Sequence, residues 1–166
     1  MLKRSLYAAL ALLLVIAGGL VLHVAIAEGD TVFSWKRPDN LGVKDGRLSA
    51  AKRTPNCVSS QADPGDAEHY IAPLPWKGGA AEAMAAVRKA VEGMRGATVI
   101  RHEGNYLYAE YRTPLMKFVD DVEFAFDDKA GVIHVRSASR LGRRDFGVNR
   151  ARVESLRGRL AGSTKA

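Results

Sequence analysis

The chain begins with a long apolar stretch. Residues 6–22 are apolar or small, and no formally charged residue follows until Glu28. Lys3 and Arg4 precede the stretch. A basic start followed by about 20 apolar residues predicts either a secretory signal peptide or a membrane anchor over residues 1–27. The small side chains at Ala25 and Ala27 favour cleavage after Ala27, whereas the length of the run favours a retained anchor.

This N-terminal segment also predicts where the rest of the chain lies. By the positive-inside rule the two basic residues stay in the cytoplasm, so the chain after Glu28 faces the other side. In a bacterium we expect the inner membrane, with a single N-terminal span and the domain in the periplasm. The alternative is secretion to the periplasm after cleavage following Ala27.

Residues 28–78 show no sustained hydrophobic period and carry five of the six prolines. This composition is typical of irregular structure, so residues 28–54 are predicted to form an irregular leader. Residues 31–35 are a candidate edge strand within it.

Two later segments have helical spacing. In residues 79–95, Met84, Val87 and Val91 recur at intervals of three and four, and Gly93 and Gly96 provide a stop. In residues 148–161, Val153, Leu156 and Leu160 form a narrow apolar stripe. Asp145 or Asn149 is the candidate cap of this second helix.

Four segments between the helices alternate like strands: residues 97–103, 106–113, 121–127 and 132–139. Short turns at residues 104–105 and 128–131 make neighbouring strands antiparallel. The second turn sets a register that pairs Phe126 with Ile133, Phe124 with Val135, and Glu123 with Arg136. The core face then holds Val122, Phe124, Phe126, Ile133 and Val135, and the opposite face holds Asp121, Glu123, His134 and Arg136. With helices on one face only, the opposite face is expected to meet water or a ligand.

The order of these elements predicts an α+β fold. We expect a two-layer domain over residues 55–161, in which a four-stranded antiparallel sheet is packed by two helices. An N-terminal transmembrane or signal helix precedes it, and residues 162–166 form a flexible tail.

The composition of the chain excludes several classes of protein and of binding site. One cysteine excludes a disulfide scaffold and a multi-cysteine metal site. No glycine-rich dinucleotide or phosphate-loop motif is present, so we expect no cofactor and no metal. The net charge of +7 is concentrated late, where residues 136–166 hold nine Lys or Arg and two acidic residues. Nucleic acid is not an expected partner, because an exported chain does not routinely meet it.

Three motifs together resemble a known family. They are residues 55–60 (Pro-Asn-Cys-Val-Ser-Ser), residues 120–124 (Asp-Asp-Val-Glu-Phe) and the block of residues 136–150, which runs from Arg-Ser-Ala-Ser-Arg to Asn-Arg. The chain resembles, from residue 55 to about 160, a bacterial and plastid family catalogued as domain of unknown function 1499. Arg143 and Arg144 are more basic than the family's pattern. The resemblance implies relatives but no substrate or catalytic residue.

The strongest candidate site is a basic loop before the second helix, around Gly142 and Gly147. Guanidinium groups and free amides at a helix start attract phosphate or carboxylate. The candidate ligand-binding residues are Arg136, Arg140, Arg143, Arg144, Asn149 and Arg150. The alternative is structural: Arg136 pairs with Glu123, and Arg140 or Arg150 pairs with Asp120 or Asp145.

A second hypothesis is an enzyme. Cys57 would need a histidine to lower its pKa, with His69, His102 and His134 available, and is otherwise a buried small side chain or half of an intermolecular bridge. Asp121 and Glu123 share a strand face and are weak candidates for an acid/base pair; ion pairing is the alternative. Structural roles are expected for Asn56, Ser59, Ser60, Asp120 and Asp145.

The leading functional hypothesis is therefore a membrane-tethered extracytoplasmic module that is not an enzyme. It would bind an anionic lipid, an envelope polymer or an acidic protein through the basic loop. The alternatives are a cell-envelope hydrolase or transferase, and a scaffold for a membrane complex.

Overall fold

The computed structural model describes residues 36–113 and 117–163. The expected signal or anchor over residues 1–27 and the candidate strand at residues 31–35 lie outside the described residues. Within the part that is described, no helix is both long and apolar enough to cross a bilayer.

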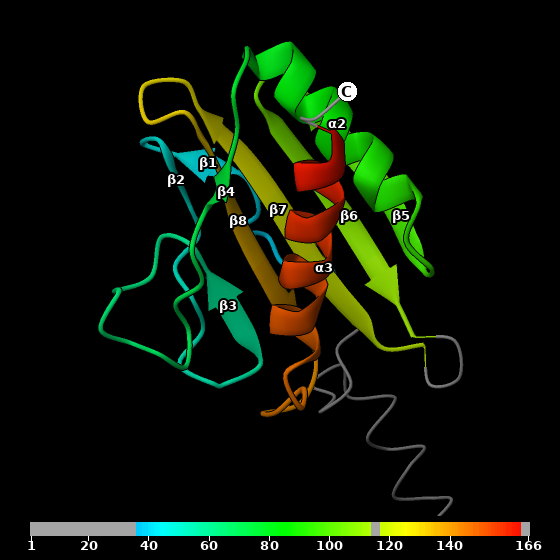
Figure 1. Cartoon of the computed structure of the whole chain (residues 1–166). Helices are drawn as coiled ribbons and strands as arrows, with labels where there is room; N and C mark the ends of the chain where they lie inside the picture. The colour runs from blue at the N-terminus through cyan, green and yellow to red at the C-terminus, as the bar shows by residue number, and fades with distance from the viewer. Residues whose placement is uncertain (1–35, 114–116, 164–166) are drawn as a thin grey trace, which may run out of the picture. The chain divides into compact units, whose positions relative to one another are not determined.

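Two helices form where the helical spacing predicts them. The helix α2 spans Ala80–Glu92 and buries Met84, Val87 and Val91. It ends at Gly93, and Gly96 then turns the chain with a φ of +80°. The helix α3 spans Val148–Ser163, and its apolar stripe is buried against the sheet. Figure 1 shows both helices on the same face of the sheet.

The predicted four-stranded sheet is wrong, because the main sheet has six strands in the order β3-β8-β7-β6-β5, with β4 also paired to β8. The four long strands are β5 (Ala97–Glu103), β6 (Tyr106–Arg112), β7 (Val119–Asp127) and β8 (Val132–Ser139). The additional strands are β3 (Cys57–Ser59) and β4 (Leu74–Pro75). Both pair with β8, whose outer edge would otherwise leave backbone groups unpaired. Three or two residues are too few to show a strand period, so the pattern missed them.

The register of the central hairpin agrees with the prediction. Phe126 lies opposite Ile133, Phe124 opposite Val135 and Glu123 opposite Arg136. The phenylalanines and their aliphatic partners face the helices and belong to the main core, together with residues of α2 and α3.

The opposite face of the sheet was expected to meet water or a ligand. In the structure it is instead covered by the chain itself. Residues 36–54 cross it, and part of this segment forms the hairpin of β1 (Val43–Lys44) and β2 (Arg47–Leu48). Leu48 packs in a second small core with Tyr106, Tyr108 and Ala125 of the sheet. The described part of the leader, residues 36–54, therefore forms a third layer, and it buries the polar side chains that this face carries.

Candidate functional site

The buried face beneath the leader carries a cluster of charged and tyrosine side chains, which we call the sheet-face cluster. Glu123 is fully buried and pairs with Arg136 at 3.1 Å. Tyr106 donates its hydroxyl to Glu123 Oε1 at 2.8 Å, and the Gly42 amide donates to the same oxygen at 2.7 Å. The cluster comprises Tyr106, Tyr108, Glu110, Asp121, Glu123, Arg136 and Arg140.

Arg140 connects two carboxylates of this cluster that lie on neighbouring strands, Glu110 on β6 and Asp121 on β7. Its guanidinium contacts Asp121 Oδ1 at 2.6 Å and Glu110 Oε1 at 2.6 Å. Tyr108 donates to Asp121 at 2.6 Å. Burial would lower the pKa of Arg140, but hydrogen bonds with the two carboxylates outweigh it and raise that pKa. Arg140 therefore holds the sheet together from within.

Glu110 receives further donors from outside the cluster. Arg37 of the leader donates to Glu110 at 2.8 Å, and Arg112 contacts its other oxygen at 2.8 Å. Burial would raise the pKa of Glu110, but hydrogen bonds from Arg140 and Arg37 outweigh it and lower that pKa to about 2. A carboxylate held ionised in this way is a structural anchor rather than a proton donor.

The two candidate acid/base residues, Asp121 and Glu123, thus each face an arginine and a tyrosine hydroxyl. Both carboxylates are almost completely buried. Nothing in this arrangement leaves a path for substrate to either carboxylate while the leader is in place. The geometry matches the ion-pair alternative, and Arg140 pairs with Asp121 and Glu110 rather than with Asp120 or Asp145.

A second buried polar cluster lies on the helix side of the sheet. Arg152 of α3 pairs with Asp120 at 2.5 Å and stacks over the Tyr111 ring at 4.6 Å. Arg152 also donates to Asn149 Oδ1 at 2.6 Å. Asn149 is fully buried and donates to the Asn56 carbonyl at 3.1 Å. Asn149 is therefore not available to a ligand, and Asp120 braces α3, consistent with a structural role.

Asn56 fixes the loop that precedes α3. Its side-chain amide donates to the carbonyls of Leu141 and Gly142 at 3.2 and 2.7 Å. Asp145 accepts from the amides of Gly147 at 3.2 Å and Asn149 at 2.7 Å. The Gly147 and Asn149 amides at the start of α3 are thus already bonded to a carboxylate, so these two are not free to attract an anion, as had been expected of the helix start.

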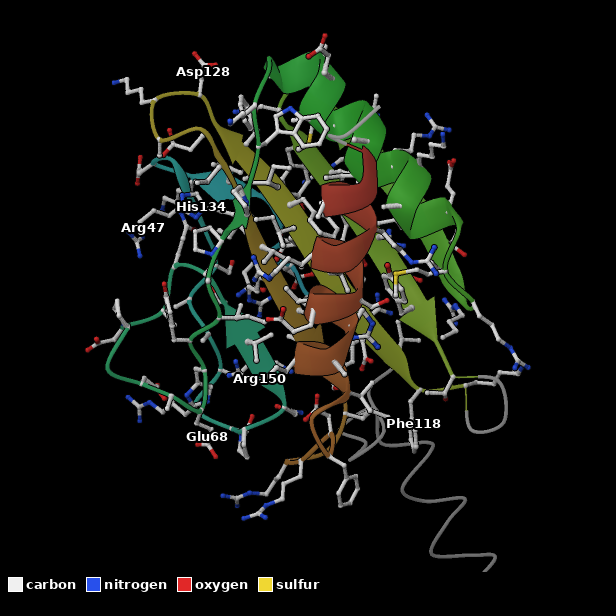
Figure 2. The ribbon with its side chains drawn as sticks, in the orientation of Figure 1. Arg47, Glu68, Phe118, Asp128, His134 and Arg150 are labelled. Atoms are coloured by element: carbon white, nitrogen blue, oxygen red, sulfur yellow. The ribbon has the colours of Figure 1, made fainter. Side chains whose placement is uncertain are left out.

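The six candidate ligand-binding residues separate into three groups. Arg136, Arg140 and Asn149 are buried in the clusters described above. Arg150 donates to three backbone carbonyls, those of Ala67, Glu68 and Tyr70, and holds that loop against α3 (Figure 2). Only Arg143 and Arg144 are exposed, and neither forms a hydrogen bond or ion pair with the described residues.

The arginine loop, residues 140–147, also exposes an aromatic side chain that sequence reasoning missed. Phe146 is 97% exposed and has a φ of +54°. Val148 is 47% exposed beside it. A cavity of about 240 Å³ opens here, lined in part by Phe118 and Leu141. The sequence pattern does not reveal which apolar residue lacks a cover, because Phe146 stands alone between polar neighbours.

Cys57 is fully buried on β3 opposite Ala138. Its thiol contacts only its neighbour's carbonyl, that of Val58, at 3.9 Å among the hydrogen bonds of the described chain. His69 bonds to Asp66 at 2.7 Å, and His134 bonds elsewhere. The fold does not place a hydrogen-bonded histidine at this thiol.

Ser60 and His134 form a contact that the sequence spacing did not suggest. Ser60 Oγ lies 3.2 Å from His134 Nδ1 and accepts the Val135 amide at 2.9 Å. His134 Nε2 is 3.8 Å from Asp127. Burial lowers the pKa of His134. The Ser60 hydroxyl is used to hold a turn against β8, in keeping with a structural role; the Ser59 hydroxyl likewise accepts the Gln61 amide at 3.2 Å.

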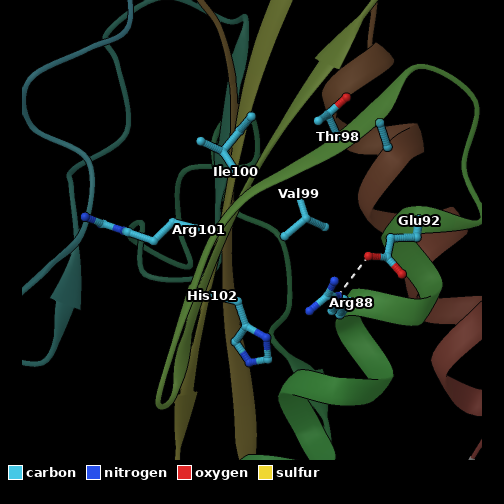
Figure 3. A pocket seen from close by; sticks show the side chains of 8 residues that line it. Arg88, Glu92, Thr98, Val99, Ile100, Arg101 and His102 are labelled. Atoms are coloured by element: carbon cyan, nitrogen blue, oxygen red, sulfur yellow. Dashed lines mark hydrogen bonds and ion pairs between the residues drawn. The ribbon is translucent and has the colours of Figure 1, made fainter.

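A separate depression of about 530 Å³ lies between α2 and the edge strand β5 (Figure 3). Arg88 and Glu92 pair across its wall at 2.8 Å, and His102 lies at another side. Both members of the ion pair are half-exposed, as in an ordinary surface pair on a helix. Within the described residues, no group of three His, Cys, Asp or Glu side chains is placed to hold a metal ion.

Together these observations define an α+β domain whose buried charged residues pair with one another. The sequence profile of the family described as protein of unknown function (DUF1499) matches residues 47–160. The chain therefore belongs to this family, as the three motifs had suggested. Neither the comparison with curated proteins nor the comparison with solved structures gave a match. The matched range excludes residues 36–46, which supply Arg37 and Gly42 to the sheet-face cluster.

Proposed function

We propose that this chain is a membrane-tethered, extracytoplasmic module that binds an anionic group through Arg143 and Arg144. The observation that supports this most directly is that these two adjacent guanidinium groups point to solvent while the neighbouring arginines are used internally. Guanidinium groups bind phosphate and carboxylate oxygens in pairs, which suits them to anionic ligands.

The rigidity of the loop supports the same proposal. Asn56 and Asp145 fix its backbone on both sides of the two arginines. A loop held in one conformation loses less conformational entropy when it binds. Asp145, the acidic residue of the loop, has its carboxylate engaged with backbone amides. The exposed surface of the loop is therefore basic.

The extracytoplasmic location is part of the proposal and rests on Lys3, Arg4 and the apolar run of residues 6–22. A catalytic role receives less support. Cys57 is buried and forms no hydrogen bond with a histidine among the described residues. The carboxylates of Asp121 and Glu123 form ion pairs with arginines. Assembly of a membrane complex stays a prediction.

The test is a titration of the full chain, reconstituted in neutral phosphatidylcholine nanodiscs, with short-chain polyphosphate as the anion. The double variant R143A/R144A should bind at least about tenfold more weakly, because it loses charge-assisted hydrogen bonds. Binding by the unmodified chain should weaken as salt rises.

The matched control is K89A/R95A, which removes two exposed basic residues near the end of α2 and leaves the arginine loop intact. It should bind polyphosphate as the unmodified chain does. Equal losses in the two double variants would show that only net charge matters and would contradict the proposal.

A further inference from the structure

The exposed apolar side chain of the arginine loop has no structural function that the described contacts reveal. Phe146 is 97% exposed, whereas the other large apolar residues on the described surface are at most about half-exposed. Its left-handed backbone, with a φ of +54°, is uncommon for a residue other than glycine. Gly147 follows with a φ of +80°, so two consecutive residues turn the chain and direct this ring outward.

Hydrogen bonds of the loop backbone fix the exposed position of this ring. The Val148 amide donates to the Asp145 carbonyl at 3.1 Å, on either side of Phe146. Asp145 also accepts the Gly147 and Asn149 amides. Three hydrogen bonds thus fix the backbone around Phe146. They hold it in the conformation that directs the ring away from the core.

The immediate surroundings of Phe146 combine apolar and basic groups. Val148 is half-exposed, and the cavity of about 240 Å³ beside it is lined in part by Phe118 and Leu141. Asp120 and Asp145 also line it, and their carboxylates are bonded to Arg152 and to backbone amides. Figure 2 shows Phe118 at the same end of the sheet as the start of α3. Lys117 is exposed next to Phe118 in sequence, and Phe118 lines the same cavity as Arg144.

An anionic bilayer surface fits this combination better than a protein partner does. A stable protein interface buries about 800 Å² on each side and needs a broad complementary surface. A single aromatic tip with a small apolar base is much narrower. Aromatic rings partition into the headgroup region, and arginine and lysine beside them contact lipid phosphates.

We propose that Phe146 inserts into the headgroup region of an anionic lipid bilayer while Arg143, Arg144 and Lys117 contact the lipid phosphates. This inference rests on the proposed function and names a lipid surface as the anionic partner. The apolar cavity beside Phe146 accommodates lipid atoms between Phe118 and Val148. Soluble anions would engage the arginines alone and leave the ring in water.

The experiment places a nitroxide on the full chain through Phe146→Cys, in nanodiscs of phosphatidylcholine with or without phosphatidylglycerol. Cys57 is fully buried, so the label reacts at position 146. In phosphatidylglycerol discs, collisions with oxygen should exceed those with a water-soluble nickel chelate severalfold. A label at Ile100→Cys, on the edge strand β5, is the control and should stay accessible to the chelate in both discs. Equal chelate access at position 146 in both discs would overturn the inference.

A second variant separates the ring from the label. With the nitroxide on Val148→Cys, the further change Phe146→Asn removes the ring, and asparagine tolerates the left-handed backbone. This change should return the label to water in phosphatidylglycerol discs. An unchanged label depth would count against insertion by Phe146.

The two proposals can fail separately. Phe146→Asn should leave polyphosphate binding unaltered, because the arginines remain. If R143A/R144A loses polyphosphate binding while label 146 stays in water, the anion site stands and the lipid inference falls. If label 146 is shielded in native membranes but not in lipid-only discs, the occupant is a protein and the inference is also wrong.

Discussion

At the scale of single residues, Glu110 shows how one carboxylate joins three parts of the chain. Its oxygens accept from Arg37 of the leader, Arg112 of its own strand and Arg140 after β8. Removing one of these donors still leaves two, whereas removing the carboxylate takes the ion-pair partner of Arg37 and Arg112 and one of the two carboxylates that Arg140 contacts. Such asymmetry is typical of buried ion pairs, where breaking a pair costs far more than the pair contributes.

This residue predicts an acid limit to stability. The pKa of Glu110 is about 2 in the folded chain, below its usual 4.5. Its contribution is therefore complete above the unfolded pKa and is lost as pH falls from about 4.5 to about 2. The free energy of unfolding should decrease over this window by up to about 3 kcal/mol more in the unmodified chain than in Glu110→Gln.

Denaturation in urea at a series of pH values between 6 and 2 measures this difference. Glu154→Gln is the control, since Glu154 forms an exposed pair with Arg157. It should follow the unmodified chain. If the free energy of unfolding depended on pH in the same way in Glu110→Gln and in the unmodified chain, the ionisation of Glu110 would not contribute to stability.

At the scale of elements, the long and periodic segments were predictable and the short ones were not. The helices, the four long strands and the register that places Glu123 opposite Arg136 follow from local spacing. The strands β3 and β4 form only because β8 offers them an edge, and this depends on contacts distant in sequence. The same limit applies to the site. Arg140 and Arg150 were assigned to a ligand because their actual partners come from other segments.

Two glycines, one in the turn before β5 and one within α3, differ in what an added methyl group would meet. At Gly96, a Cβ would lie 2.5 Å from the Arg112 carbonyl oxygen, and φ is +80°. Gly96→Ala should therefore destabilise the chain by about 2 kcal/mol. At Gly158, in α3, nothing lies within 4 Å of the added atom. Gly158→Ala should stabilise the chain by up to about 1 kcal/mol, because alanine favours the helix.

Thermal unfolding of both variants, in the full chain, checks the pair. The two midpoints should move in opposite directions from that of the unmodified chain. An increase in both midpoints would mean that the close approach at Gly96 is relieved by movement of the neighbouring strand. A decrease in both would contradict the prediction for Gly158.

At the scale of the whole molecule, the domain has three layers: helices, sheet and leader. Helix-facing residues form the main core, and the leader closes the charged face over Glu110, Asp121 and Glu123. The sequence pattern identified the charged face correctly but not its cover, because residues 36–54 have no period that predicts a packing partner. Composition and charge likewise indicated a basic loop without showing that Phe146 projects from it.

The proposed location belongs to this scale as well. A reporter enzyme that works only outside the cytosol, fused after Ala166, should be active in cells. Replacing Lys3 and Arg4 by glutamate should reduce that activity, because the charge asymmetry that orients the segment is lost. Activity of a cytosol-only reporter at the same position would refute the location and remove the basis for an envelope ligand.

The leader's attachment has a mechanical consequence. Among the described residues, the first attachment of the leader to the sheet joins Arg37 to Glu110 on β6, an interior strand. Tension arriving at residue 36 along the chain therefore reaches this strand rather than an outer one. The next attachment, from Gly42 to Glu123, lies on the adjacent strand. Force is therefore shared between two interior strands. A force on an edge strand can break its hydrogen bonds one at a time, whereas here the bonds of neighbouring strands must resist the force together.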